Sequence, residues 1–543
     1  MANRRLALSF TFLLVVAICA ALLFAIPVLT PGQGDGRSPN LEEVDGGRDY
    51  YARFSNPLPA RSDYFPIAGF LRPAFDARRF ASYADFGMNV FLGVENPELT
   101  NEAMIRRAGM QTFVQSDERR RFNDIGSENV GHFIGDEVDM CCGPPDFAGG
   151  NGYQMLADTL AGLPQDGKAR FANYGKGVMF WESDHDAQRF VNEFQDIVSN
   201  DIYWFTDPNE RNRPGYRVAA SYGTTVDRMR HLDSLDGRRK PIWNVVELGW
   251  PFTESAAAGG RRILPAELRA AVWHSIIAGA RGIVYFDHNF GPGTPGSTIR
   301  GEGYQDTRAV AISVNRQIKR LASVLNAPTL TSGWTANSSI RAMVKWQGGH
   351  FYVFAGSRNN VSSTGRVSIP CVGDAKAVRL GEAGRVPISG GSFTDSFADG
   401  NAIHIYRIDG GSTCGLPPPP SGSPPSGSPP SGSPPPNGFT FGKLKRNLRK
   451  GTAKLTVRVS GPGALRLKKT SRVRGVSKRA AEVGSVRLRI RPRGEARRRL
   501  KRVGERKRTS KAEVTAKVRY RPTGGEPSKK SKRLTLKRRH GRR

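Results

Sequence analysis

The chain has 543 residues, and 82 Lys and Arg against 48 Asp and Glu give it a formal net charge of +34. The charge is uneven, because residues 438–543 hold 39 Lys and Arg and 5 Asp and Glu, whereas the other 437 residues hold 43 of each. A uniformly basic nucleic-acid-binding protein is therefore excluded, and 38% hydrophobic residues exclude general disorder and a polytopic membrane protein. The composition describes a neutral globular body with a basic appendage.

The N-terminus predicts export. Arg4 and Arg5 precede an apolar run from Leu6 to Leu29, which is typical of a secretory signal. A run of about 24 residues also suffices to cross a bilayer at ~1.5 Å per residue. Residues 1–30 are thus either a cleaved signal peptide or a retained membrane anchor, followed by a flexible segment over 31–59. The expected location is outside the cell or in its envelope.

Four cysteines besides Cys19 agree with an oxidising compartment, which tolerates an even number. Cys371 and Cys414 both lie in the last β-rich stretch of the body, and we expect them to pair. Cys141 and Cys142 are adjacent, so they form either a vicinal bridge or two separate buried thiols. No C-x-x-C motif or spaced His accompanies them, which argues against zinc, and no cofactor is expected.

Residues 60–328 alternate short apolar β-type runs with amphipathic helical segments. The expected strands are Pro66–Leu71, Met88–Val94, Met110–Gln115, His132–Gly135, Ala169–Asn173, Ile202–Thr206, Pro241–Val246 and Gly282–Phe286. The helical segments include Phe75–Phe86, Asn101–Gly109, Gln154–Leu163, Asp186–Ile197, Tyr216–Leu235, Pro265–Ala280 and Thr307–Leu325. Eight β-then-α units predict an α/β fold of the (β/α)₈ barrel type. The alternative is an open doubly wound sheet, which the absence of a G-x-G-x-x-G turn disfavours.

Three further segments follow the barrel. Short alternating strands over 329–414 predict a small β-sandwich. Residues 415–437 form a Pro/Ser/Gly linker, a semi-rigid spacer of roughly 60 Å at ~3.1 Å per residue. In residues 438–543 apolar side chains alternate with basic ones, which predicts a folded, basic, β-rich (Ig-like) domain instead of a disordered arm.

Polar residues follow most of the barrel strands, where the carboxyl ends converge on one face. Taken singly, such a residue often caps the next helix or faces water. Glu137 and Glu247 differ, because each follows a strongly apolar strand (HFIGDE and IWNVVE) and neither is expected to precede a helix directly. Both side chains are therefore expected to point into the barrel mouth.

These residues resemble the glycoside hydrolases of clan A, retaining enzymes on a (β/α)₈ barrel. The resemblance implies that Glu137, after strand 4, is the acid/base and that Glu247, after strand 7, is the nucleophile. The segment LRAAVWHSIIAGARGIVYFDH (268–288) also looks like barrels of this clan, and a β-sandwich is a common companion. Asp136 departs from the pattern, because many members carry Asn before the acid/base.

The chemistry requires two carboxyl groups with different protonation states. One must donate a proton to the leaving oxygen while the other, ionised, attacks the anomeric carbon. A retaining pair lies about 5–5.5 Å apart and an inverting pair ~6.5–9.5 Å apart.

Aromatic and polar residues near the strand ends are expected to bind a sugar, because sugar C–H faces stack on rings. Trp204 and Tyr285, inside their strands, can equally be core residues. The DHD run at 184–186 is interpreted as a helix start after Ser183 without a metal. The candidate substrate-binding residues are Arg72, Asp136, Trp181, Trp204, Asp207, Trp250, Tyr285, Asp287 and His288.

The basic tail is expected to bind an anionic polymer of the cell envelope or a membrane surface by charge. Only Phe439, Phe441 and Tyr520 are aromatic there, which argues against nucleic acid. The tail also resembles basic all-β C-terminal modules of secreted bacterial proteins. The sequence thus predicts an exported glycosidase, and the alternative is a non-catalytic carbohydrate-binding or adhesion protein on the same scaffold.

Overall fold

A computed structural model of the chain describes a set of ranges separated by gaps. They are 39–70, 83–93, 105–106, 108–115, 126–144, 150–252, 259–287, 303–409, 414–416, 439–459, 463–480, 484–501, 509–522 and 528–539. The apolar N-terminal segment, the Pro-rich linker and most of the first predicted helix lie outside these ranges. The chain divides into two compact units, residues 1–421 and 422–543.

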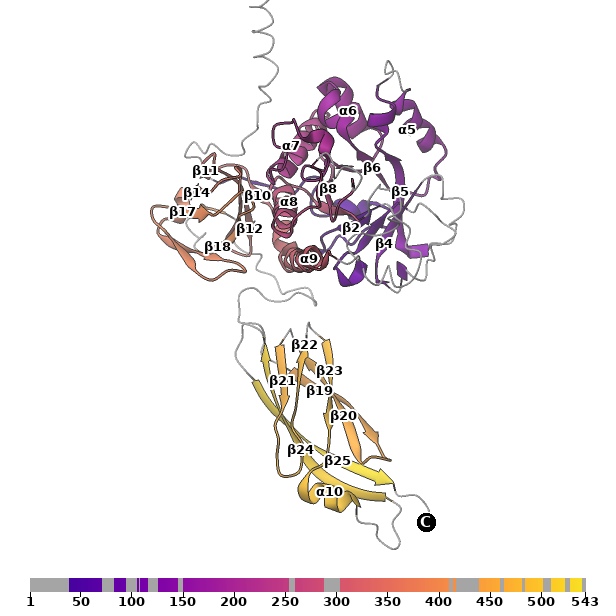
Figure 1. Ribbon diagram of the computed structural model, residues 1–543, viewed down its shortest axis with the longest axis vertical. Helices are drawn as coiled ribbons and strands as arrows, with labels where there is room; N and C mark the ends of the chain where they lie inside the picture. The colour runs from indigo at the N-terminus through magenta and orange to yellow at the C-terminus, as the bar shows by residue number, and fades with distance from the viewer. Residues whose placement is uncertain are drawn as a thin grey trace, which may run out of the picture. The chain divides into compact units, whose positions relative to one another are not determined.

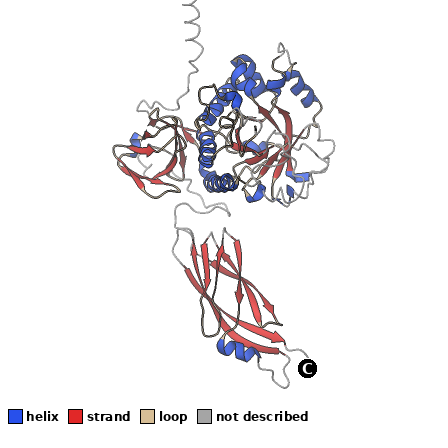
Figure 2. Ribbon diagram, in the orientation of Figure 1, coloured by secondary structure: helices blue, strands red, loops and turns tan. Residues whose placement is uncertain are grey.

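The first unit contains a closed barrel of eight parallel strands (Figures 1 and 2). The strands are β2 (Ile67–Phe70), β3 (Val90–Leu92), β4 (Gln111–Gln115), β5 (Asn129–Asp136), β6 (Ala169–Tyr174), β7 (Ile197–Asn200), β8 (Ile242–Glu247) and β9 (Gly282–Phe286). Each strand pairs with the next, and β9 pairs with β2, so no strand edge is left unpaired. The prediction of a (β/α)₈-type barrel is confirmed.

The sixth strand lies five residues before its expected position. We predicted Ile202–Thr206, but the strand is β7 (Ile197–Asn200), and residues 202–206 form an irregular loop with a turn after it. The IYWFT run is buried as loop against the barrel, so its apolar character reflects packing and not strand pairing. The residue that follows the sixth strand is consequently Asp201 and not Asp207.

Large aromatic side chains fill the barrel interior. The Trp243 ring lies 5.3 Å from that of Phe171 and 6.1 Å from that of Phe113, centroid to centroid. The Trp243 indole N–H donates to the Tyr51 hydroxyl at 3.1 Å. Gly282 is the register partner of Trp243, and a Cβ there would lie 2.5 Å from the indole ring. The glycine therefore makes room for the tryptophan.

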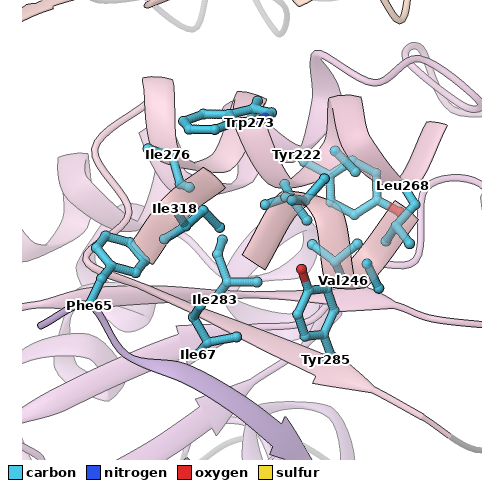
Figure 3. Close-up of a cluster of buried hydrophobic side chains, with 14 of the residues drawn as sticks. Phe65, Ile67, Tyr222, Val246, Leu268, Trp273, Ile276, Ile283, Tyr285 and Ile318 are labelled. Carbon is cyan, nitrogen blue, oxygen red and sulfur yellow. The ribbon is translucent and has the colours of Figure 1, made fainter. Parts of the chain in front are cut away.

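Helices cover the outer face of the barrel. They include α4 (Val138–Cys141), α5 (Gly152–Ala161), α6 (Asp184–Glu193), α7 (Ser221–Ser234), α8 (Pro265–Ile277) and α9 (Gln305–Leu325). Figure 3 shows Ile67, Ile283 and Tyr285 of the strands beside Trp273 of α8 and Ile318 of α9. Ser183 caps α6, as the sequence predicted, and accepts from the Asp186 N–H. No helix within the described ranges is long and apolar enough to cross a membrane.

Two antiparallel sheets form the sandwich beside the barrel. One has the order β1-β10-β12-β13-β18-β15-β16 and the other β11-β14-β17. Their bounds are β1 (Leu41–Glu42), β10 (Thr329–Leu330), β11 (Thr335–Ala336), β12 (Ile340–Gln347), β13 (His350–Ser357), β14 (Ser363–Ser368), β15 (Ala375–Arg379), β16 (Arg385–Ile388), β17 (Ser392–Phe397) and β18 (Ile403–Asp409). The Cys371–Cys414 disulfide is present as expected. Arg341 of β12 forms an ion pair with Asp227 of α7, which joins the sandwich to the barrel.

The second unit is a β-sandwich with its own core. Its sheets have the orders β19-β20-β23 and β22-β21-β24-β25. The elements are β19 (Phe439–Asn447), β20 (Thr452–Val459), β21 (Gly463–Leu467), β22 (Val476–Ala480), β23 (Gly484–Ile490), α10 (Gly494–Lys501), β24 (Thr509–Pro522) and β25 (Ser528–Arg539). Side chains from both sheets, including Leu455, Leu488, Leu465 and Val518, form one buried cluster. The basic tail is thus a folded module.

Trp243→Ala is expected to destabilise the first unit by about 3–5 kcal/mol, because it empties the barrel centre and removes the bond to Tyr51. Urea unfolding followed by circular dichroism measures this loss. Trp181→Ala removes an equally large but 49% exposed side chain and should cost less than about 1 kcal/mol. Equal losses in the two variants would contradict the assignment of Trp243 to the core.

Candidate active site

Glu137 occupies an abrupt turn at the end of the fourth barrel strand. A bulge between Phe133 and Gly135 precedes it, and its backbone is left-handed, with φ 49° and ψ 32°. Contrary to our expectation, α4 begins at the next residue, yet the Glu137 side chain makes no capping bond to it. The Glu137 N–H donates to the Asn173 carbonyl at 2.9 Å, which fixes the turn. A left-handed non-glycine residue costs about 1–2 kcal/mol, and such strain concentrates at functional sites.

A cluster of polar side chains surrounds the Glu137 carboxyl. Asn173 of β6 donates to Asp136 at 2.9 Å and accepts from the Ser199 hydroxyl at 2.6 Å. Asp201 follows β7 and forms a side-chain hydrogen bond with Glu137. The cluster therefore joins the carboxyl ends of barrel strands 4, 5 and 6.

Burial and neighbouring carboxylates keep protons on this cluster. Burial, reinforced by the charge of Asp136, raises the pKa of Glu137 to about 7. Burial and the charge of Glu137 raise the pKa of Asp201 well above its ordinary range. At neutral pH the Glu137–Asp201 pair therefore holds at least one proton. This proton lies in the hydrogen bond between the two carboxyl groups.

Glu247 ends the seventh barrel strand and faces inward. Trp243 and Val245 belong to the barrel interior, whereas Val246 packs on the helix side, so alternation directs Glu247 inward. Its side chain has no exposed surface. Thus the barrel and the loop above it enclose this carboxyl.

Three donors converge on the Glu247 carboxyl. They are the Tyr222 hydroxyl of α7, the Thr206 hydroxyl at 3.2 Å and the Phe205 N–H at 3.3 Å. Burial raises the pKa of Glu247 to about 7, and these donors oppose the rise. The donors around Glu247 thus favour its negative charge against the effect of burial, whereas the carboxylates around Glu137 add to the effect of burial.

A chain of contacts places both glutamates at the same end of the barrel. Glu247 is the register partner of Phe286, whose ring lies 5.2 Å from that of Tyr203. The Tyr203 hydroxyl donates to Asp201 at 3.1 Å, and Asp201 forms a hydrogen bond with Glu137.

The environments do not separate the two pKa values as the sequence hypothesis required, since both glutamate pKa values are raised to about 7.

The mouth end of the barrel carries an exposed ring and two buried polar atoms without a partner among the described residues. Buried Asp139 accepts from the Gly175 and Val178 N–H groups and holds a π-helical turn that ends in exposed Trp181. The half-buried Trp250 has an indole N–H that finds no partner within the described ranges, and the same holds for Gln115 Oε1. Such atoms suit the hydroxyls of a sugar.

Two predicted substrate-binding residues, Trp204 and Tyr285, lie on the helix side of the barrel wall. The Trp204 indole N–H donates to Thr225 of α7, and the Tyr285 hydroxyl donates to Asn315 of α9, so both rings are buried on the helix side. This corrects their assignment to the mouth, because alternation turns Tyr285 outward and Trp204 belongs to a loop. Asp207 is buried and forms an ion pair with Lys176. Asp287 is buried directly after β9.

Arg72 and His288 lie outside the described residues. The sequence reasoning missed three members of the site, namely Asp201, Asn173 and Tyr222. For Asp201 a usable signal existed, because it directly follows the short buried run IVSN. Tyr222 carried no such signal, since its role depends on the approach of α7 to the end of β8.

A disulfide lies four residues after Glu137 in the chain, at the end of α4. Cys141 and Cys142 form the vicinal bridge, which settles the alternative left open by the sequence.

Within the described ranges no group of three or more His, Cys, Asp or Glu side chains is placed to hold a metal ion.

No protein-family model matches the sequence, and no curated protein matches it. Solved structures similar to the chain include a GH30 endoxylanase from Clostridium papyrosolvens, at 12% identity and a TM-score of 0.38, covering 69% of this chain and 98% of that one. A glycoside hydrolase family 5 protein from Bacteroides vulgatus has 12% identity and a TM-score of 0.39, covering 67% and 92%. A maltogenic alpha-amylase from Thermotoga neapolitana has 8% identity and a TM-score of 0.40, covering 64% and 98%. Similarity at this level does not establish an activity for this chain.

Glu137→Gly is expected to be more stable than Glu137→Ala by about 1 kcal/mol, because glycine relieves the left-handed backbone and alanine keeps its Cβ. Both variants remove the same carboxyl, so their difference isolates the backbone. Urea unfolding of the two variants measures it. An alanine variant as stable as the glycine variant would show that the turn is not strained.

Glu247→Gln is expected to gain stability over the native chain as pH rises. The folded pKa of Glu247, about 7, lies above its ordinary 4.5, so the native chain loses stability between about pH 4.5 and 7, by up to about 3 kcal/mol. Urea unfolding at pH 5 and pH 8 measures the change, with Glu193→Gln, at an exposed ion-paired site on α6, as control. A gap between native and Glu247→Gln stability that does not widen with pH would contradict the burial of an ionisable Glu247.

Proposed function

We propose that this chain is a glycoside hydrolase that cleaves O-glycosidic bonds in a carbohydrate polymer or oligosaccharide with retention of configuration. One observation carries the proposal: two glutamates follow barrel strands 4 and 7 and have opposite surroundings. Glu247 meets three hydrogen-bond donors, whereas Glu137 lies among carboxyl groups. The reaction needs one ionised and one protonated carboxyl. Both pKa values are raised to about 7, so near pH 7 the two groups can share one proton, and the donors around Glu247 and the carboxyl groups around Glu137 favour that proton on Glu137.

The roles follow from the surroundings. Glu247, as carboxylate, forms a bond to the anomeric carbon while the bond to the leaving oxygen breaks and that oxygen takes the proton of Glu137. Water then attacks the anomeric carbon, returns a proton to Glu137 and releases Glu247. The Tyr222 hydroxyl holds Glu247 in one orientation during both steps.

Substrate binding is assigned to the rim of the mouth. Exposed Trp181 offers a ring to a sugar face. The Trp250 N–H and Gln115 Oε1 are buried without a partner among the described residues, and they bond to sugar hydroxyls only if the mouth opens to admit them. The apolar N-terminal run supports export of the enzyme, to the cell surface or beyond it.

One observation favours a second candidate, a non-catalytic carbohydrate-binding or adhesion protein. Glu247 has no exposed surface, and Tyr222 of α7 occupies one of its oxygens. A substrate reaches such a carboxyl only if the groups that enclose it move aside. In a binding protein Glu247 would instead hold α7 against the barrel.

The basic module is proposed to retain the enzyme on anionic polymers of the cell envelope or on a membrane surface. Its cations are solvent-exposed on strands of a folded sandwich, so they are presented to a partner in fixed positions.

A screen of aryl glycosides and polysaccharides tests the catalytic proposal. Glu247→Gln should lower kcat by about 10³-fold or more, and Glu137→Gln by about 10²–10⁴-fold on substrates with poor leaving groups. The acid must be protonated and the nucleophile ionised, and both pKa values are about 7, so kcat/KM should be highest near pH 7 and fall on either side of it. In Glu137→Ala, azide should restore turnover of an activated aryl glycoside and give the glycosyl azide with retained configuration.

Glu193→Gln, on the exposed side of α6, is the control and should keep full activity. Binding of an oligosaccharide without turnover by the native chain, unchanged in Glu247→Gln, would support the non-catalytic candidate. Full activity in Glu247→Gln would remove Glu247 from the chemistry.

A further inference from the structure

Each sheet of the second unit carries a row of cations on its outer face. The two sheets share one core, so their outward faces point in opposite directions. In β20 and β24 the buried residues alternate strictly with outward ones, which assigns each cation to a face. The strands of the module are shown in Figure 1.

On the β19-β20-β23 sheet, Lys445, Lys454 and Arg489 are direct cross-strand partners. All three side chains are exposed. Arg458 and Arg487 extend the cationic surface on the same face. No Asp or Glu occupies an outward position of these three strands within the described residues.

On the β22-β21-β24-β25 sheet, Arg466, Arg519 and Lys529 are direct cross-strand partners in the same way. These side chains are also exposed. The outward positions of β24 include Lys511 and Lys517 and, near its start, Glu513. The second face thus repeats the pattern of the first.

Such rows oppose folding. Cross-strand neighbours have Cβ atoms about 4.5–5.5 Å apart, and like charges at that spacing repel. An anionic chain that runs along a row removes the repulsion and releases its own counterions, so the rows favour a polyanion as ligand.

The surface between the cations selects the kind of polyanion. Phe439 and Tyr520 are buried, and Phe441 is half-buried and packed against the core, so the described residues of the module offer no row of exposed rings on which bases could stack. Among the described residues of this unit, Leu448 is the one large apolar side chain that is exposed. The module therefore has little apolar surface that could insert into lipid. A flat membrane would also engage one face and leave the other repulsive.

We propose that the module binds linear anionic glycan chains on both faces at once and so bridges two chains. The proposal deepens the retention role given under Proposed function and rests on it. A bridging module would hold the enzyme inside a network of anionic chains, whereas a module with one binding face would hold it on a surface.

The experiment uses the full chain with heparin as the probe. Protein bound to heparin beads is offered fluorescent heparin in solution, and the captured fluorescence reports bridging. Lys445→Gln/Lys454→Gln/Arg489→Gln neutralises one row, and Arg466→Gln/Arg519→Gln/Lys529→Gln neutralises the other. Arg497→Gln/Arg498→Gln/Lys501→Gln, on exposed positions of α10, removes the same charge away from the rows.

Each single-row variant should still bind the beads, with a weaker dependence on salt, and should capture less than about a tenth of the soluble heparin. The α10 variant should capture as much as the native chain. Loss of bead binding in one row variant and none in the other would mean a single binding face and overturn bridging. Binding to anionic vesicles but not to heparin would overturn glycan bridging and leave retention on a membrane surface. Binding to neither heparin nor vesicles, or to duplex DNA alone, would overturn the retention role itself. Circular dichroism verifies that each variant is folded.

Discussion

Closure of the parallel sheet, through the pairing of β9 with β2, is the constraint on which the site depends. An open sheet would leave strands 4 and 7 with their ends in a row, whereas a closed one turns the ends toward a common opening. Closure also removes water from that opening, because aromatic rings such as Trp243 and Phe286 fill the space beneath. The raised pKa values of Glu137 and Glu247 follow from this loss of solvent.

The two glutamates have the same raised pKa of about 7, but the kinds of neighbour around them differ. Hydroxyl and N–H donors reach Glu247 from the loop after β7 and from α7, and each donor stabilises its charge. Around Glu137, the charges of Asp136 and Asp139 act in the opposite direction. Lys176 moderates this effect, although Asp207 and Glu210 engage its ammonium group. The asymmetry is therefore built from loops, while the strands supply position.

The barrel and the two glutamates could be predicted from the sequence because both depend on local patterns. Buried parallel strands are continuous apolar runs, and the residue after each run lies at the mouth, which located Glu137 and Glu247. The sixth strand failed this reasoning, because IYWFT is more apolar and aromatic than the true strand IVSN. The misplaced strand made Asp207 the predicted residue at the strand end, although Asp201 occupies that position. Tyr222 could not be found by any local pattern, since a helix brings it to Glu247 across 25 positions of the chain.

Two places in the molecule violate local preference without a benefit to folding, and both lie where a ligand is proposed. Glu137 adopts a left-handed backbone that glycine would accept more readily, although the N–H bond to Asn173 needs no glutamate side chain. The cationic rows place like charges opposite one another, although lysine and arginine could alternate with threonine or serine as they do in neighbouring registers, such as Thr456 with Arg487. A sequence selected for stability alone would relax both features. Their presence in otherwise consistent β-structures is explained if the cost in stability is recovered when a sugar occupies the mouth and an anionic chain occupies the rows.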